Sequence, residues 1–462
     1  MESRKKFLTY TYIYVSAILI FGCWLLSFMK NNNFLHLKFD IESLGFVIIG
    51  IIALLVQIFI VDSFYFSVLL IFSPIAFSRS FDLTTMPPTL YILVIFAILG
   101  IAINMIIHPR RIKKGTYFFS FLIFCIGMCL GGLIKSDAFL NSLIASLSLS
   151  FAIVFIYLYI VTYLEKHSFK ELCHIMIAFS LIMIMQTLFY QLLMHKDAMF
   201  LNKDAHYGWG CTNNLAIMML LTFPFTIYLT IDVKRPLVPF FILFFGAQML
   251  TIMLNYSRGA IFVSFIMAPI CVVYAFIKTK EKLLFSLYYV IFAFIIFAFF
   301  VVLHAFKIEL YNAIWSNIFH VNLETLNGRK DIYLKMLEAS KDHLLFGRGL
   351  MSTQAADIYT VNPESLAQNG YLWAHNSFIH CLYISGIFGI ACMIYHLYTK
   401  YHALLKKPNA KKILVLLGFL TSGFYGLMDI SYYYIIYMVI MIVVMALIEY
   451  EISDDEEIED EA

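Results

Sequence analysis

Long apolar runs separated by short polar breaks follow one another along most of this 462-residue chain. A bilayer core of roughly 30 Å calls for about 20 apolar residues per helix, so the pattern predicts an all-α protein, a polytopic transmembrane helical bundle with about 14 spans. The expected spans cover residues 7–29, 44–61, 64–77, 89–107, 116–134, 138–163, 171–194, 212–231, 237–254, 259–277, 283–305, 375–398, 413–428 and 432–448. The breaks at 62–63 and 429–431 are very short, so the spans beside them form either tight hairpins or something less regular.

One long polar stretch interrupts this pattern. The expected organisation is eleven spans in residues 1–305, a long external loop over 306–374, three spans in 375–448 and an acidic cytoplasmic tail over 449–462. In the loop, Asn327-Gly328 indicates a turn, and the segment from Arg329 to Lys341 predicts an amphipathic helix lying on the membrane or on the bundle. Its expected apolar face consists of Ile332, Tyr333, Met336 and Leu337. The tail is expected to be solvated, with a contact to basic partners as the alternative.

Composition places the chain outside the soluble globular class. Hydrophobic residues make up 62% of it, charged residues only 13%, and the mean hydropathy is +0.85, which is the signature of a polytopic membrane protein. The net charge of +3 is small and the basic residues are spread between the apolar runs. We therefore expect the lipid bilayer as a partner and no nucleic acid.

The distribution of lysine and arginine predicts the orientation. With the N-terminus inside, the breaks rich in basic residues, such as 110–114, 278–282 and the cluster from Lys400 to Lys412, all fall on the inner side, as the positive-inside rule requires. Both termini are then cytoplasmic and the long loop faces outwards. The first span follows Arg4-Lys5-Lys6 but is too long for a signal-peptide core, so we expect it to stay as an anchor.

Arg258 lies in an outer break, between Ser257 and Gly259, and has no acidic residue close to it in sequence. One interpretation is an interfacial arginine that reaches lipid headgroups and caps a helix C-terminus. The other is an anion clamp, because a planar guanidinium grips a diphosphate with two parallel hydrogen bonds. The adjacent glycine lets the backbone approach a ligand closely.

Two further arginines lie in the long loop. Arg329 begins the predicted helix, where the helix dipole disfavours a cation, so a binding role is the better explanation of its position. Arg348 lies in Gly347-Arg348-Gly349, a flexible connection whose arginine contacts phosphate or solvent; it ranks below Arg258 and Arg329.

His375 opens a predicted span on the outer side and follows two aromatic residues of the interfacial belt, Tyr371 and Trp373. Its neutral imidazole is a suitable base for a hydroxyl near neutral pH, and the amide of Asn376 is able to orient a substrate. The alternative for the histidine is an interfacial or capping role.

Together these residues resemble the O-antigen polymerase and O-antigen ligase superfamily. The resemblance rests on Ser257 to Ala260 at the outer face, a long loop with Arg329 and the aromatic Tyr333, Gly347-x-Gly349, and His375-Asn376 before Gly386-Ile387-Phe388-Gly389. It covers roughly residues 212–398. Relatives often have tryptophan where this chain has Tyr333, and about 14 spans exceeds the usual count.

The resemblance implies the polymerisation of lipid-linked oligosaccharide repeat units into a capsule or O-antigen type of surface polysaccharide. The donor would be an undecaprenyl-diphosphate-linked oligosaccharide at the outer face of a bacterial cell membrane. Arg258, Arg329 and His375 would be the catalytic residues, with Arg348 also at the donor diphosphate and Asn376 and Tyr333 orienting the acceptor. The scheme requires no cofactor and no metal, and its partners would include a flippase and a chain-length regulator.

Two alternatives stay open. A ligase has the same parts but hands a finished glycan to another acceptor. A lipid-linked oligosaccharide flippase belongs to a different class, for which about 14 helices is ordinary. Against the flippase, charged residues keep to the span ends and the deep polar residues are mostly amides and hydroxyls.

Overall fold

The computed structural model describes residues 2–36, 41–76, 88–133, 139–194, 212–232, 235–255, 257–305, 329–350, 374–429, 431–449 and 451, and every regular element in these ranges is helical. The all-α class is therefore confirmed for the described chain. The α-helices are α1 (Glu2–Asn31), α2 (Ile41–Phe59), α3 (Ser63–Phe72), α4 (Pro88–Ile107), α5 (Phe118–Leu133), α6 (Phe139–Tyr163), α7 (Phe169–Met194), α8 (Thr212–Asp232), α9 (Val238–Leu254), α10 (Arg258–Lys278), α11 (Lys282–Ala305), α13 (Arg329–Ser340), α15 (Ser377–Leu405), α16 (Ala410–Tyr425) and α17 (Ile435–Leu447). Short 3₁₀ turns occur at η1 (Ser73–Ala76), η2 (Arg235–Leu237), η4 (Lys341–His343) and η6 (Ser431–Tyr433).

Each predicted span coincides with one of these helices. Six of the described helices are long and apolar enough to cross a membrane, and most of the others are shorter apolar helices. The chain is thus a multi-pass membrane protein, but the count of about 14 crossings is not confirmed. Helix α3 shows why, because its 10 residues extend only about 15 Å, half the thickness of a bilayer core.

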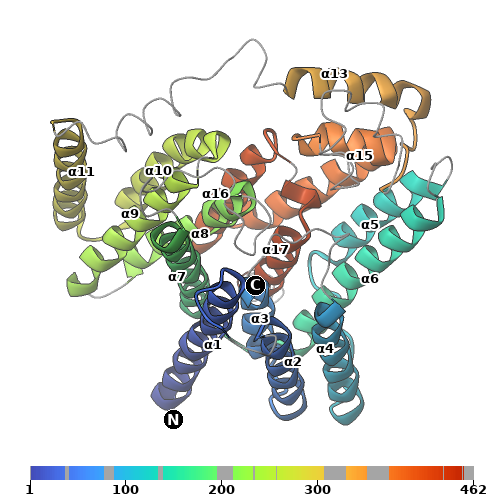
Figure 1. Cartoon of the computed structure of the whole chain (residues 1–462), viewed down its shortest axis with the longest axis horizontal. Helices are drawn as coiled ribbons and strands as arrows, with labels where there is room; N and C mark the ends of the chain where they lie inside the picture. The colour runs from blue at the N-terminus through green and yellow to red at the C-terminus, as the bar shows by residue number, and fades with distance from the viewer. Residues whose placement is uncertain are drawn as a thin grey trace.

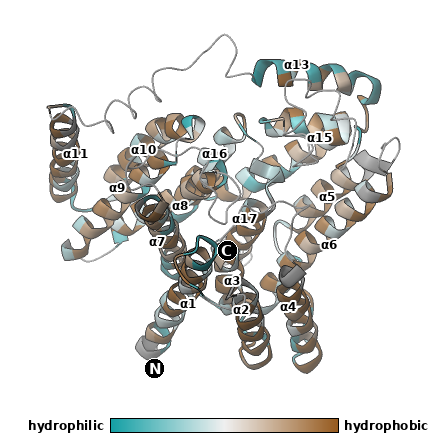
Figure 2. Cartoon of the chain, viewed as in Figure 1, coloured by the Kyte–Doolittle hydropathy of each residue, from teal (hydrophilic) through white to brown (hydrophobic). Residues whose placement is uncertain are grey.

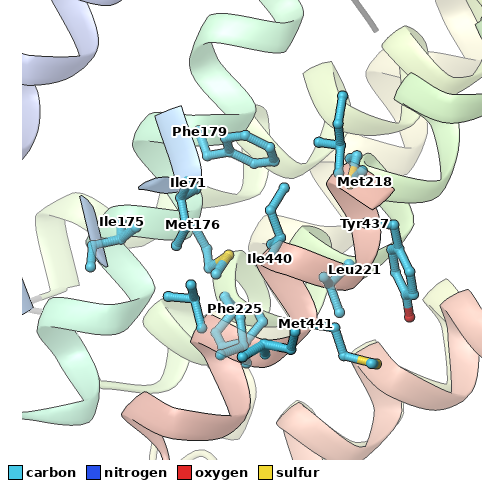
Figure 3. Packing of buried hydrophobic residues seen from close by; sticks show 14 of the residues in the cluster. Ile71, Ile175, Met176, Phe179, Met218, Leu221, Phe225, Tyr437, Ile440 and Met441 are labelled. Atoms are coloured by element: carbon cyan, nitrogen blue, oxygen red, sulfur yellow. The ribbon is translucent and has the colours of Figure 1, made fainter. Parts of the chain in front are cut away.

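The centre of the bundle is formed by helices that are apolar on all sides. Helix α17 packs against α3, α6 and α8 (Figure 1), and its residues from Ile436 to Ala446 are almost entirely buried. A helix without a polar face belongs inside a bundle rather than at its rim. Figure 3 shows Ile440 and Met441 of α17 packed among side chains of α3, α7 and α8, such as Ile71, Met176 and Leu221.

Helix α13 lies across one end of the bundle, against α15 (Figure 1). The helix predicted over Arg329 to Lys341 is therefore present. Its Met336 is buried and Ile332 packs against the core, whereas Leu337 is exposed. In Figure 2 the hydrophilic colour is prominent on α13, in contrast to the apolar spans.

Helix α15 is broken at Gly386, whose φ of 65° and ψ of −164° are open only to glycine. The turn from Leu344 to Gly349 fills the break with paired backbone hydrogen bonds. The N–H groups of Arg348 and Gly349 donate to the carbonyls of Tyr383 and Ile384, and the N–H groups of Ile387 and Phe388 donate to those of Leu344 and Leu345. Gly347 and Gly386 are thus explained by one packed crossing between the turn and the helix, since a Cβ atom at either would meet the backbone of the other segment.

A buried ionic cluster ties α3 to α7. The two ring nitrogens of His167 lie 2.5 Å from Asp62 Oδ2 and 2.8 Å from Glu171 Oε2, and the ring stacks on Phe64. Asp62 also accepts the N–H of Phe64 at the start of α3. Burial lowers the pKa of His167, but the hydrogen bonds and charges of the two carboxylates outweigh it and raise the pKa to about 9.

The predicted acidic tail begins with two residues that have structural partners. Glu449 is buried and accepts the N–H groups of Thr116 and Tyr117, just before α5, and the hydroxyl of Tyr157. Glu451 pairs with Lys411 at 2.8 Å. Residues 452–462 lie outside the described part of the chain, as do residues 306–328 and 351–373 of the predicted loop.

Candidate functional site

His375 lies beside a carboxylate that comes 54 residues later in the chain. Its Nδ1 is 3.4 Å from Oδ1 of Asp429, and 32% of the histidine side chain but only 10% of the aspartate side chain is exposed. The backbone of His375 has a φ of 47°, the left-handed region that is uncommon for a residue other than glycine. Strained backbone of this kind is concentrated at functional sites, so the position of this imidazole is a candidate for chemistry.

Asp429 is held by side chains of α8 and α16. Its Oδ2 accepts hydrogen bonds from Nδ2 of Asn213 at 3.1 Å and from the hydroxyl of Tyr425 at 3.3 Å. The Tyr425 oxygen is also 2.9 Å from the hydroxyl oxygen of Ser257, next to Arg258. Because both carboxylate oxygens have partners, the Asp429 side chain has a defined orientation toward His375.

Asn376 caps α15. Its side-chain oxygen accepts the N–H groups of Phe378 and Ile379, and its Nδ2 donates to the carbonyl of Leu427 at 2.9 Å. The amide is thus occupied by the helix start, a capping role that was not predicted from the sequence. Its bond to Leu427 also fixes the start of α15 to the segment that leads into Asp429.

Helix α13 brings two predicted residues to the same place. Nη1 of Arg329 donates to the carbonyl of Met428, next to Asp429. The hydroxyl of Tyr333 donates to the carbonyl of His375 at 2.8 Å. Burial raises the pKa of Tyr333, with Arg329 opposing the shift, so the phenol is a hydrogen-bond donor near neutral pH.

Arg258 begins α10 at the other side of the same segment. Gly259 packs so closely that a Cβ atom there would lie 3.2 Å from Met428 Sδ and 3.2 Å from Tyr425 Cε2. Arg258 itself is partly exposed. It is the first residue of α10, whereas the interfacial interpretation placed it as a cap at a helix C-terminus. The fold therefore brings Arg258, Arg329 and His375, which are far apart in sequence, to the segment formed by residues 425–429.

Residues 240–394 match the O-antigen ligase family model. The match confirms the resemblance to the O-antigen polymerase and ligase superfamily, and it supports a membrane enzyme of that type. It covers about a third of the chain, from the first turn of α9 to the part of α15 beyond its break. No curated protein matches the chain.

Arg348 also lies within the O-antigen ligase match, but at a different place in the fold. It is 7% exposed and its Nε donates to the carbonyl of Ala339 at 2.9 Å. Ala339 is ten residues beyond Arg329, or about 15 Å along α13 at 1.5 Å per residue. The structure thus places this arginine in the packing of α13 on the turn before α15, apart from Arg329.

Asp429 is the residue that sequence reasoning missed. It lies beyond the O-antigen ligase match, in a short break between two predicted spans. The signal that could have revealed it is a carboxylate between two predicted spans, on the same predicted side of the membrane as His375. Among the described residues no group of three or more His, Cys, Asp or Glu is arranged to hold a metal ion.

Proposed function

We propose that this protein polymerises lipid-linked oligosaccharide repeat units by glycosyl transfer at the outer face of the membrane. The observation that carries the proposal is the convergence of the His375–Asp429 pair with Arg329 and Arg258 on one segment at one end of the bundle. A base oriented by a carboxylate, with two arginines at the same segment, provides the kinds of group that transfer from a diphosphate-linked donor requires.

In this reaction the bond between the sugar C1 and the diphosphate oxygen breaks, and the diphosphate leaves with the electron pair. Arg258 and Arg329 bind the diphosphate and stabilise the charge that grows on it. The acceptor hydroxyl oxygen forms the new bond to C1. Because Nδ1 of His375 faces Asp429, Nε2 is the nitrogen that accepts the hydroxyl proton, and Asp429 stabilises the resulting imidazolium.

Tyr333 acts on this site through the histidine backbone. Its hydrogen bond to the His375 carbonyl supports the left-handed conformation that presents the imidazole. Asn376 orients the start of α15 in the same way rather than touching the acceptor. The donor is proposed to be a polyprenyl-diphosphate-linked glycan, since guanidinium groups suit a diphosphate and the chain is a multi-pass membrane protein.

A ligase is the second candidate, because the family model that matches carries that description. Polymerase and ligase share the donor half of the reaction and differ in the acceptor. A polymerase uses another lipid-linked repeat unit, whereas a ligase uses a different acceptor molecule. The acceptor therefore has to be tested directly.

The test uses purified protein in lipid nanodiscs with lipid-linked repeat units as the sole donor and acceptor. A polymerase makes a ladder of glycans that grows by one repeat unit per step. His375→Ala and Arg329→Ala are expected to lower the rate about 100-fold or more, while Lys330→Ala, an exposed cation adjacent to Arg329, retains it. Transfer only to an added non-repeat acceptor identifies a ligase, and no transfer to any acceptor contradicts both candidates.

A further inference from the structure

Lys400 belongs to the basic residues that the sequence assigns to the inner side, but it differs from a solvent-exposed loop lysine. The side chain is completely buried within α15. Its amino group lies 4.8 Å from the ring centre of Phe419, which stands near the middle of α16, about 13 Å from that helix's first residue. The amino group of this lysine is thus packed between α15 and α16.

The surroundings of Lys400 are aromatic rather than acidic. Its Nζ donates to the Tyr432 hydroxyl at 2.7 Å and lies over the rings of Tyr401, Phe419 and Tyr432. In the described part of the chain no carboxylate pairs with it. A buried amino group is costly unless it is paired or hydrogen-bonded. The hydrogen bond to Tyr432 is thus the contact that accounts for a lysine at this position.

Tyr432 belongs to η6, three residues beyond Asp429. Ser377 contacts the chain before Tyr432 twice. Its N–H donates to the carbonyl of Gly426, and its hydroxyl donates to the carbonyl of Asp429 at 3.1 Å. Helix α15 therefore contacts residues 426–429 and 431–433 at two points. One is its own N-terminus, next to His375, and the other is Lys400, beyond the break at Gly386.

We propose that Lys400 is a positioning residue for the transfer reaction. By holding Tyr432 it fixes residues 426–429 and 431–433 so that the Asp429 carboxylate faces His375. The expected change in transfer rate rests on the proposed function, whereas the expected change in the mobility of residues around Asp429 does not. Lys400 touches no substrate in this scheme and acts only through Tyr432 and Asp429.

The first measurement is hydrogen exchange of the backbone amides in full-length protein in nanodiscs. Lys400→Met and Tyr432→Phe are expected to speed exchange in peptides covering residues 426–434, with the core helices unchanged. The controls are Lys406→Met, at an exposed position of the same chain segment, and Tyr437→Phe, which removes the hydroxyl that lies 2.6 Å from Ser422. Unchanged exchange in Tyr432→Phe, a variant that loses one oxygen atom, overturns the proposal whether or not the enzyme is active.

The second measurement is the transfer rate. Lys400→Met and Tyr432→Phe are expected to lower kcat at least about tenfold with little change in KM, since a displaced catalytic group slows the chemical step. In an Asp429→Asn background the same changes should have little further effect, because Lys400 acts through that carboxylate. An equal loss in both backgrounds indicates general destabilisation and overturns the proposal. Altered exchange in a protein that transfers no glycan contradicts the proposed function instead.

Discussion

The imidazole of His375 lies 3.4 Å from the carboxylate of Asp429, across the gap between the start of α15 and the end of α16. The two residues are brought together by the capping amide of Asn376, which holds Leu427, and by the hydroxyl of Ser377, which holds Asp429. The pair is therefore built by the packing of two helices and not by a local motif. It is the feature on which the proposed chemistry depends most.

Replacing Asp429 tests this pair. Asp429→Asn keeps the size of the side chain but removes the charge that stabilises a protonated His375, so we expect kcat to fall roughly 100-fold. The transfer assay with lipid-linked repeat units measures this. Asp331→Asn, at an exposed position on α13, is the matched control. Full activity of Asp429→Asn would show that the carboxylate has no part in the reaction.

Replacing Gly386 tests the break in α15. An alanine there has to adopt a φ of 65°, and its Cβ would meet the backbone of Leu345 and Phe346, so we expect a loss of about 3 kcal/mol of stability or a failure to fold. Gly22→Ala, in α1, is the control, because a Cβ atom at that position meets nothing within 4 Å. Thermal unfolding in detergent compares them. Equal stability of the two variants would contradict the strained break.

The cluster around His167 predicts a pH dependence of stability. The folded pKa of about 9 is raised above the unfolded value of about 6.5, so the stabilisation is fully present below pH 6.5 and is lost as the pH rises through 9. The expected loss is about 3 kcal/mol. Unfolding is followed between pH 6 and pH 10. His167→Gln should be less stable at pH 6 and should lack most of this slope; a slope that persists in the variant assigns it to other groups.

Glu449 and Glu451 are expected to differ although both belong to the predicted acidic tail. Glu449→Ala leaves the buried hydroxyl of Tyr157 and the N–H of Thr116 without this acceptor, while the N–H of Tyr117 keeps the Tyr157 oxygen, which costs about 2 kcal/mol. Glu451→Ala loses a partly exposed pair with Lys411, a change of less than about 1 kcal/mol. Denaturant unfolding of both variants measures the difference. A larger effect at Glu451 would mean that the burial of Glu449 contributes little.

Part of the candidate site could be predicted from the sequence. Arg258, Arg329 and His375 were identified because each stands at a break or at the edge of an apolar run, where a polar residue is conspicuous. Asp429 was missed because a short break between two apolar spans does not tell which other break it will face. Arg348 is predicted at the donor diphosphate together with the other arginines, but its Nε donates to the carbonyl of Ala339. This contact exists only after α13 packs on the turn before α15.

The sequence by itself determined the helices of this protein and its membrane class, because the length and apolarity of a run are local properties that the bilayer selects directly. It also determined the superfamily resemblance, whose motifs lie within one continuous stretch. Only the tertiary structure decided that Asp429 faces His375 and that Lys400 is buried beside Tyr432. These are contacts between segments remote in sequence, and they depend on how the helices pack against one another, which neither hydropathy nor charge counting records.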